Sequence, residues 1–171
     1  YCFFLANVVR DLRGDSLEPR TMMINISRFV KVQNYIKGKI ENLFNDTYHE
    51  IETNFSENDD KNKNLNLYTE LKECWDRCYS KLDIEWAEVC KKENLISAIE
   101  NIEVLVINSG KNSGKLDYEK NPHLRAIAVG GLALSRGLTL EGLLVSYFYR
   151  NTSTYDVLMQ MGRWFGYRKN Y

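Results

Sequence analysis

The 171-residue sequence has no excess of either charge, few prolines and no long hydrophobic run. Lys and Arg number 23, as do Asp and Glu, so the total charge gives no general attraction to nucleic acid or to an anionic membrane. No stretch of about 18 uncharged apolar residues exists, which excludes a membrane-spanning helix. Two Pro, ten Gly and 44% hydrophobic residues exclude collagen-like, low-complexity and disordered chains. These absences predict a soluble, globular, cytoplasmic protein.

The two ends of the sequence suggest a piece of a longer polypeptide. The chain starts at Tyr1 without a methionine and ends at Tyr171, directly after an Arg-rich stretch. The first residues lack the basic flank and the small-residue cleavage site of a secretory signal. We therefore expect that parts of an active site missing from these residues lie elsewhere in the longer polypeptide.

The neutral total hides an uneven distribution of charge. Residues 101–171 contain 9 Lys and Arg against 5 Asp and Glu, a net charge of +4. Residues 1–100 contain the remaining 14 basic and 18 acidic residues, a net charge of −4. A phosphate-bearing partner is therefore compatible with the chain if it binds a local patch.

Apolar spacing predicts helices and strands that alternate. Short continuous apolar runs predict buried strands at 21–26, 102–107, 124–129 and 143–149. Spacings of three and four predict helices at 2–13, closed by Gly14, at 29–55, where Gly38 is a possible break, and at 67–82, 86–99 and 155–165. Ser27 is placed to cap the helix that follows the first strand. Residues 56–64 have no apolar side chain and predict an exposed loop.

This order predicts a single α/β domain over 1–171 with a parallel sheet flanked by helices. Residues 29–100 separate the first two strands, which is too long for an ordinary crossover. They are predicted to be a helical insertion within the domain.

Two glycine-containing segments are candidates for binding phosphate. The loop from Asn108 to Leu116 is not a Walker A loop, because only three residues separate Gly110 from Gly114 and Leu116 stands where Ser or Thr is required. A plain surface loop is favoured there. In the segment 128–142, Gly130 and Gly131 follow a strand and would let backbone N–H groups approach a phosphate. The alternative is that these glycines only permit tight turns.

The segment 160–169 combines basic and aromatic side chains. Arg163, Arg168 and Lys169 lie within seven residues, among three aromatics. Guanidinium groups can neutralise charge on a transferred phosphoryl group, and aromatic rings can stack on a base. Composition alone favours the simpler interpretation of a solvated basic end with Trp164 and Phe165 in the core.

Together these segments resemble the second RecA-like domain of superfamily-two helicases and ATPases. The run from Ile127 to Leu140 is similar to family motif V, in which a strand ending in small residues precedes an Arg-Gly turn. The run from Gln160 to Arg168 resembles family motif VI, a Gln followed by Gly-Arg and a further Arg on a helix. Residues 21–27 correspond to the strand that carries motif IV.

More narrowly, the sequence resembles the bacterial Z-one domain family. The resemblance rests on residues 134–142, on 155–168 and on the strand Thr21-Met-Met-Ile-Asn-Ile-Ser-Arg28. The family is described as an endonuclease domain associated with a helicase-like ATPase in DNA-processing proteins. It implies a helicase-like module acting on DNA, beside an N-terminal RecA-like ATPase domain of the same polypeptide.

The resemblance also implies roles for individual residues. Arg163 would be the arginine finger that reaches ATP on the partner domain, assisted by Arg168 and Gln160. The nucleotide would be contacted by three residues, Arg136, Gly137 and Thr139. Nucleic acid would be contacted by four others: Gly130, Gly131, Ser27 and Arg28. ATP and Mg²⁺ would be held by the partner domain, since the chain has no acceptable P-loop. The fragment alone is therefore expected to be inactive.

Other readings of the sequence have less support. A nucleic-acid-binding module without an ATPase role could use the same Gly and Arg residues. A metal-dependent nuclease needs converging carboxylates, but Glu70-Leu-Lys72 lies on a helical pattern and Asp59-Asp-Lys61 in the predicted loop. Cys74 and Cys78 form a single pair, whereas a structural zinc site usually shows two pairs. A domain of this size buries enough surface to need no disulfides, so the cysteines are predicted to be core residues and no metal is expected.

Overall fold

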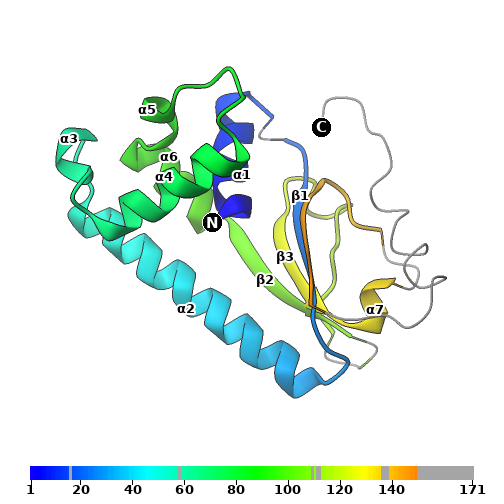
Figure 1. Cartoon of the computed structure of the whole chain (residues 1–171). Helices are drawn as coiled ribbons and strands as arrows, with labels where there is room; N and C mark the ends of the chain where they lie inside the picture. The colour runs from blue at the N-terminus through cyan, green and yellow to red at the C-terminus, as the bar shows by residue number, and fades with distance from the viewer. Residues whose placement is uncertain (16, 58, 109, 111–112, 136–138, 150–171) are drawn as a thin grey trace. The chain divides into compact units, whose positions relative to one another are not determined.

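The computed structural model describes residues 1–171 except 16, 58, 109, 111–112, 136–138 and 150–171. The described chain forms two compact units (Figure 1). The first contains Tyr1–Ser16 and Asn42–Ile102, and the second contains Leu17–Glu41 and the chain from Glu103 onward. The helix predicted over 155–165 lies outside the described residues.

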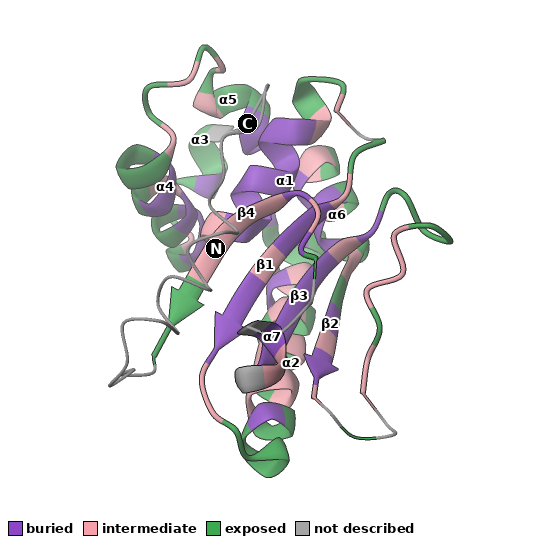
Figure 2. Ribbon diagram, turned by 90° about the vertical axis from the view of Figure 1, so that its right-hand side faces the viewer, coloured by how far each residue is buried: buried purple, intermediate pink, exposed green. Residues whose placement is uncertain are grey.

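The second unit is built on a four-stranded parallel sheet. Its strands are β1 (Arg20–Asn25), β2 (Ile102–Ile107), β3 (Arg125–Gly130) and β4 (Leu143–Phe148), in the order β2-β3-β1-β4. β1 pairs in parallel with β3 and with β4. The two central strands are almost wholly buried, as their continuous apolar runs predicted, whereas β4 is half-buried and exposed at its end (Figure 2). The predicted α/β class and parallel sheet are confirmed.

The start of β4 is fixed to β1 by a close backbone approach. Gly142 has φ +60°, and a Cβ at this position would overlap the carbonyl oxygen of Pro19. The backbone N–H of Thr21 donates to the carbonyl of Gly142 at 2.8 Å. The Thr21 hydroxyl donates to the carbonyl of Glu141 at 2.7 Å and contacts the Tyr118 hydroxyl at 2.9 Å. Gly142 is therefore required by both its conformation and its neighbour.

A long helical stretch separates β1 from β2, as predicted. It consists of α2 (Val30–Asn54), α3 (Asp59–Asn62), α4 (Asn66–Cys78), α5 (Trp86–Val89) and α6 (Lys92–Glu100). α2 passes through Gly38 without a break, because a single glycine lowers helix propensity by only about 1 kcal/mol. Its residues up to Glu41 belong to the second unit and those from Asn42 to the first.

The first unit has a hydrophobic core of its own. In it, α1 (Cys2–Leu12) packs against α4, α5 and α6. Gly14 follows α1 with φ +78°, which confirms it as the residue that ends the helix. The core side chains come from all of these helices and from the second half of α2: Phe4, Leu5, Val8, Ile51, Leu71, Trp75, Val89, Leu95 and Ala98.

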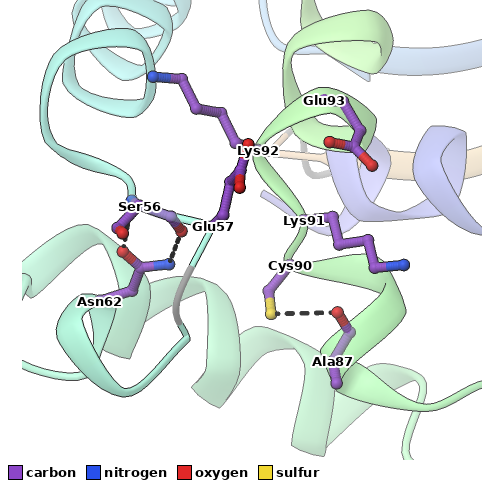
Figure 3. Close-up of a pocket in the computed structure, with 8 residues that line it drawn as sticks. All are labelled: Ser56, Glu57, Asn62, Ala87, Cys90, Lys91, Lys92 and Glu93. Atoms are coloured by element: carbon purple, nitrogen blue, oxygen red, sulfur yellow. Dashed lines mark hydrogen bonds between the residues drawn. The ribbon is translucent and has the colours of Figure 1, made fainter.

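The prediction of an exposed loop at 56–64 is wrong in its second half. Residues 59–62 form α3, and Asn62 is only 2% exposed. The Asn62 side chain accepts from the Ser56 N–H at 2.8 Å and donates to the Ser56 carbonyl at 2.9 Å (Figure 3). One buried amide thus satisfies both backbone groups of Ser56, which allows a polar segment to pack without apolar side chains.

Within the part of the chain that the structure describes, no helix is long and apolar enough to cross a membrane.

Candidate functional site

The carboxyl edge of the sheet between β1 and β3 has the topology of a ligand-binding crevice. From β1 the chain continues to β2, which lies on the far side of β3 in the sheet. From β3 it continues in the opposite direction to β4, which lies on the far side of β1. The connections that follow these neighbouring strands therefore run in opposite directions. In open α/β sheets ligands bind at such a reversal, outside the carboxyl ends of the strands. Figure 2 shows α7 (Leu132–Ser135) at this edge.

Four of the residues predicted to contact nucleic acid are brought together at this edge. In the register Asn25 lies opposite Gly130, so β1 and β3 end level with each other. The Ile26 N–H donates to the Gly130 carbonyl at 3.0 Å. A Cβ on Gly131 would overlap the carbonyl oxygen of Ser27 and lie 3.1 Å from the Cα of Arg28. Ser27 and Arg28 therefore share one backbone surface with Gly130 and Gly131.

Gly130 also packs closely against the end of β2 and against α7. A Cβ there would lie 2.6 Å from the Ile107 carbonyl oxygen at the end of β2 and 2.8 Å from the Leu134 side chain in α7. Leu134 is fully buried in the core of the second unit, beside Met23, Ala128 and Ile107. These contacts show that packing against the protein's own chain, and not turn formation alone, requires glycine at both positions. The approach of a phosphate to these glycines stays a prediction.

The turn after β1 is fixed by Ser27 and Gln33. The Phe29 N–H donates to the Ser27 hydroxyl oxygen at 3.2 Å. The Gln33 side chain, 2% exposed, donates to the Ser27 carbonyl at 2.7 Å. Because α2 begins at Val30, Ser27 stabilises the turn before the helix and does not cap its first turn.

The turn before α2 and the first turns of this helix carry exposed basic and aromatic side chains. We call this surface the α2 basic face and define it by five residues: Arg28, Phe29, Lys31, Tyr35 and Lys39. The Arg28 guanidinium lies 5.0 Å from the centroid of the Phe29 ring, and the Lys39 ammonium 5.5 Å from that of Tyr35. Lys31, Tyr35 and Lys39 are spaced by four and share one side of the helix. Figure 2 shows these first turns largely exposed.

Sequence reasoning missed this face because it counted charge over 1–100, where acidic residues prevail. Residues 28–40 contain four basic and no acidic residues. The first acidic side chain after them, Glu41, pairs with Lys37 at 3.4 Å, and Lys37 is not part of the face. A charge count in shorter windows would have revealed the patch.

The remaining predicted site residues fall mostly outside the described chain. Thr139 is described and exposed. The other five lie outside the described residues: Arg136, Gly137, Gln160, Arg163 and Arg168. Their roles stay predictions.

The whole chain, residues 1–171, matches the Z1 domain. The protein belongs to the Z1 domain family. This confirms the resemblance to the Z-one family drawn from the sequence. No curated protein and no solved structure matches the chain.

The loop after β2 of this Z1 domain uses its own polar groups internally. The Asn108 N–H donates to the Ser113 hydroxyl at 3.0 Å, and the Asn108 side chain accepts from the Gly110 N–H at 2.7 Å. The Gly114 N–H donates to the Val106 carbonyl at 2.8 Å. These N–H groups are therefore not directed at a ligand, which agrees with the favoured reading of a surface loop.

A pocket of about 340 Å³ in the first unit is lined by eight residues (Figure 3): Ser56, Glu57, Asn62, Ala87, Cys90, Lys91, Lys92 and Glu93. Its cations already have partners. Lys91 pairs with Glu88 at 2.7 Å, and Lys92 donates to the carbonyl of Glu52. The Cys90 thiol donates to the Ala87 carbonyl. No reactive arrangement follows from these contacts.

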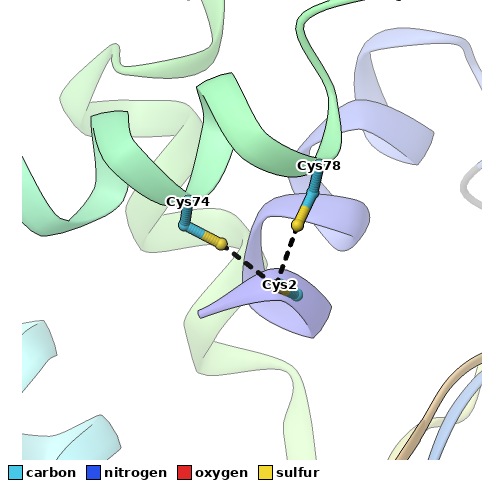
Figure 4. Close-up of side chains that lie close together, drawn as sticks. All are labelled: Cys2, Cys74 and Cys78. Atoms are coloured by element: carbon cyan, nitrogen blue, oxygen red, sulfur yellow. Dashed lines mark hydrogen bonds between the residues drawn. The ribbon is translucent and has the colours of Figure 1, made fainter.

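The Z1 domain also contains a cluster of three thiols that the sequence did not predict. The Cys2 Sγ lies 3.1 Å from that of Cys74 and 3.3 Å from that of Cys78 (Figure 4). Cys74 and Cys78 share a face of α4, and Cys2 reaches them from the first turn of α1. The spacing of the pair was visible in the sequence, but the third thiol lies 72 residues before Cys74. Only the packing of α1 against α4 brings it there.

Cys2 and Cys74 differ in acidity. Burial opposes ionisation of Cys2, but hydrogen bonds from Cys74 and Cys78 outweigh it and hold the pKa of Cys2 below its usual value. Burial raises the pKa of Cys74 to about 12, and its hydrogen bond and the charge of Cys2 act in the same direction. Cys2 therefore becomes a thiolate before Cys74 does.

Proposed function

We propose that this Z1 domain is the second RecA-like module of an ATP-driven, DNA-processing motor. The observation that carries the proposal is the carboxyl edge of the sheet between β1 and β3. There a reversal of strand order coincides with two glycines whose backbone packs against Ser27 and Arg28. In the sequence the same glycines lie within the segment that resembles motif V. Fold topology and motif thus point to the same edge of the sheet.

In this proposal the carboxyl edge of β1 and β3 and the α2 basic face bind the DNA backbone. Arg28 belongs to both, so the two surfaces are continuous. Exposed ammonium and guanidinium groups can neutralise phosphates, and the exposed rings of Phe29 and Tyr35 can stack on bases. Such a surface suits single-stranded DNA, because only unpaired bases offer their faces for stacking.

The catalytic contribution is proposed for the segment that resembles motif VI. Arg163 acts as an arginine finger toward ATP on a neighbouring RecA-like domain, with Gln160 and Arg168 assisting. Arg136, Gly137 and Thr139 approach the same nucleotide. That neighbouring domain supplies the P-loop and the Mg²⁺ ligands, since this chain offers no Walker A sequence.

The test uses the whole protein that contains this domain and measures ATP hydrolysis with and without single-stranded DNA. Arg163→Ala should abolish the DNA-stimulated turnover, whereas Arg13→Ala, an exposed arginine just after α1, should leave it unchanged. The present chain alone should hydrolyse no ATP. If Arg163→Ala hydrolyses ATP at the wild-type rate, the arginine-finger role is wrong.

A second candidate function is a DNA-binding module without a role in ATP hydrolysis. The α2 basic face favours it, because its contacts need no nucleotide. Salt-dependent DNA binding by this chain alone, together with an unchanged ATPase rate in Arg163→Ala, would select this candidate.

A nuclease function finds no support in the described residues. Among them, the three thiols are the one group of His, Cys, Asp or Glu side chains placed to hold a metal ion. Two-metal nuclease chemistry instead relies on carboxylates. Mg²⁺-dependent nicking of DNA by this chain would contradict the proposal.

A further inference from the structure

We propose that Cys2, Cys74 and Cys78 bind one zinc ion through three thiolates, with a water molecule as the fourth ligand. The site lies in the first unit and does not depend on the proposed motor function. It joins the first turn of α1 to the last turns of α4.

The distances between the sulfur atoms fit this ion. All three Sγ atoms lie within 4.8 Å of one another. Tetrahedral zinc with Zn–S bonds of about 2.3 Å places its sulfur ligands about 3.8 Å apart. The observed separations of 3.1 and 3.3 Å need to widen by well under about 1 Å, which small side-chain rotations supply.

The backbone around the thiols is already fixed by packing. Phe3 and Phe4, directly after Cys2, are 3% and 1% exposed, and Trp75, directly after Cys74, is 4% exposed. The Tyr79 hydroxyl donates to the Cys2 carbonyl at 2.7 Å. The ligands are therefore presented by rigid elements, which lowers the entropic cost of forming the site.

One side of the cluster is open to solvent. Cys74 is buried, Cys2 is half-buried and Cys78 is exposed. Within the described residues, no fourth His, Cys or carboxylate belongs to the group. A water molecule can therefore complete the tetrahedron from the side of Cys78, as in zinc sites with an open position.

Zinc binds all three sulfurs as thiolates, so the protonated thiols have to lose their protons. On binding, each thiol that is still protonated releases its proton to solvent as its Zn–S bond forms, leaving a centre of net charge −1. Arg77 interacts with Cys2 and Cys78 and offsets that charge.

Thiolate ligands select zinc over magnesium or calcium, which prefer oxygen. Copper(I) is also thiophilic, and a disulfide between Cys2 and Cys74 would use the same atoms. Zinc is preferred because the half-open cluster leaves room for the fourth ligand that tetrahedral zinc needs. The test below distinguishes zinc from copper(I) and from the disulfide.

The test loads the full chain, reduced and freed of metal by a chelator, with Zn²⁺ and measures the metal retained after gel filtration. We expect about one zinc per chain and a rise in the melting temperature. With Co²⁺ as a spectroscopic probe, thiolate-to-cobalt charge-transfer absorption should appear. Cys78→Ser should weaken zinc binding more than about a hundredfold, because even outer-shell partners are worth about 10–100-fold.

Cys90→Ser is the matched control. Cys90 is also a buried thiol of the first unit, but it hydrogen-bonds to the Ala87 carbonyl and is not part of the cluster. The Cys90→Ser variant should therefore bind zinc like the wild type. Cys78 is exposed, so its replacement should leave the fold intact, which circular dichroism checks. Equal zinc binding by Cys78→Ser and the wild type would overturn the proposal. So would a reduced chain that retains copper(I) but no zinc, or one that retains neither and only forms the disulfide.

Discussion

Gly131 lies directly against the carbonyl oxygen of Ser27, so that a Cβ on Gly131 would overlap this oxygen. The contact joins the turn after β3 to the turn after β1 at the carboxyl edge of the sheet. Because the obstacle is backbone, it cannot move away as a flexible side chain could. This edge therefore depends on the absence of a side chain at position 131.

Gly131→Ala should destabilise the domain by about 1–3 kcal/mol, the usual cost of forcing an extra methyl group into a packed site. Gly38→Ala is the control, because a Cβ at Gly38 meets nothing within 4 Å and the residue lies within α2. It should stabilise the domain by about 0.5–1 kcal/mol. Urea unfolding followed by circular dichroism measures both. Equal stability of the two variants would show that the edge tolerates a side chain.

The α2 basic face should account for much of the salt dependence of DNA binding. Lys31→Ala and Lys39→Ala should each weaken binding to any single-stranded sequence and reduce the salt slope by about 1, the value for one lost phosphate contact. Lys120→Ala is the control, since its side chain is 86% exposed but lies in the loop before β3, beside Asp117. Titrations at several salt concentrations give the slopes. An effect of Lys120→Ala as large as that of Lys31→Ala would argue for non-specific attraction.

Asn62 should be essential to the turn before α4. Asn62→Ala removes both hydrogen bonds to the part-buried Ser56 backbone, at a cost of about 1–3 kcal/mol. Asn64→Ala, two residues later and exposed, should cost little. Hydrogen exchange at the Ser56 amide reports the local effect directly. Protection of that amide in Asn62→Ala would contradict the role assigned to the side chain.

Thr21→Val keeps the shape of a fully buried side chain but removes its hydroxyl. The variant loses the hydrogen bond to the Glu141 carbonyl and the contact with Tyr118, and should be less stable by about 1–3 kcal/mol. Thr69→Val, at an exposed position of α4, provides the comparison and should change stability far less. Thermal unfolding of the two variants distinguishes them; equal melting temperatures would mean that the Thr21 hydroxyl contributes nothing.

Local patterns predicted most of the described secondary structure. Apolar runs placed all four strands within a residue or two, because a strand buried on both faces has few polar side chains. Helical spacing placed α1, α2 and α4, and it placed α5 and α6 as a single helix over 86–99. The observed break is at Cys90 and Lys91, between the end of α5 at Val89 and the start of α6 at Lys92. Spacing does not reveal such a break, since the apolar face continues across it.

The features that sequence missed depend on tertiary contacts. The Cys2 thiol reaches Cys74 only because two helices distant in sequence pack together. The burial of Asn62 depends on its hydrogen bonds to the backbone N–H and carbonyl of Ser56, which composition does not predict. The motif resemblance correctly identified the family. It assigned Gly130, Gly131, Ser27 and Arg28 to nucleic-acid contact, and the fold brings these four residues together, but the contact itself stays a prediction. Residues 136–138 and 150–171 lie outside the described chain, so the roles assigned there rest on resemblance.

The most direct test of the central claim is the DNA-stimulated ATPase rate of the whole protein carrying Arg163→Ala. An arginine finger acts on the charge that develops in the transition state, so kcat should fall by about 10³–10⁵. The KM for ATP should change much less, and binding of single-stranded DNA should persist. A wild-type kcat in this variant would contradict the assignment of this Z1 domain as the second RecA-like module of a motor.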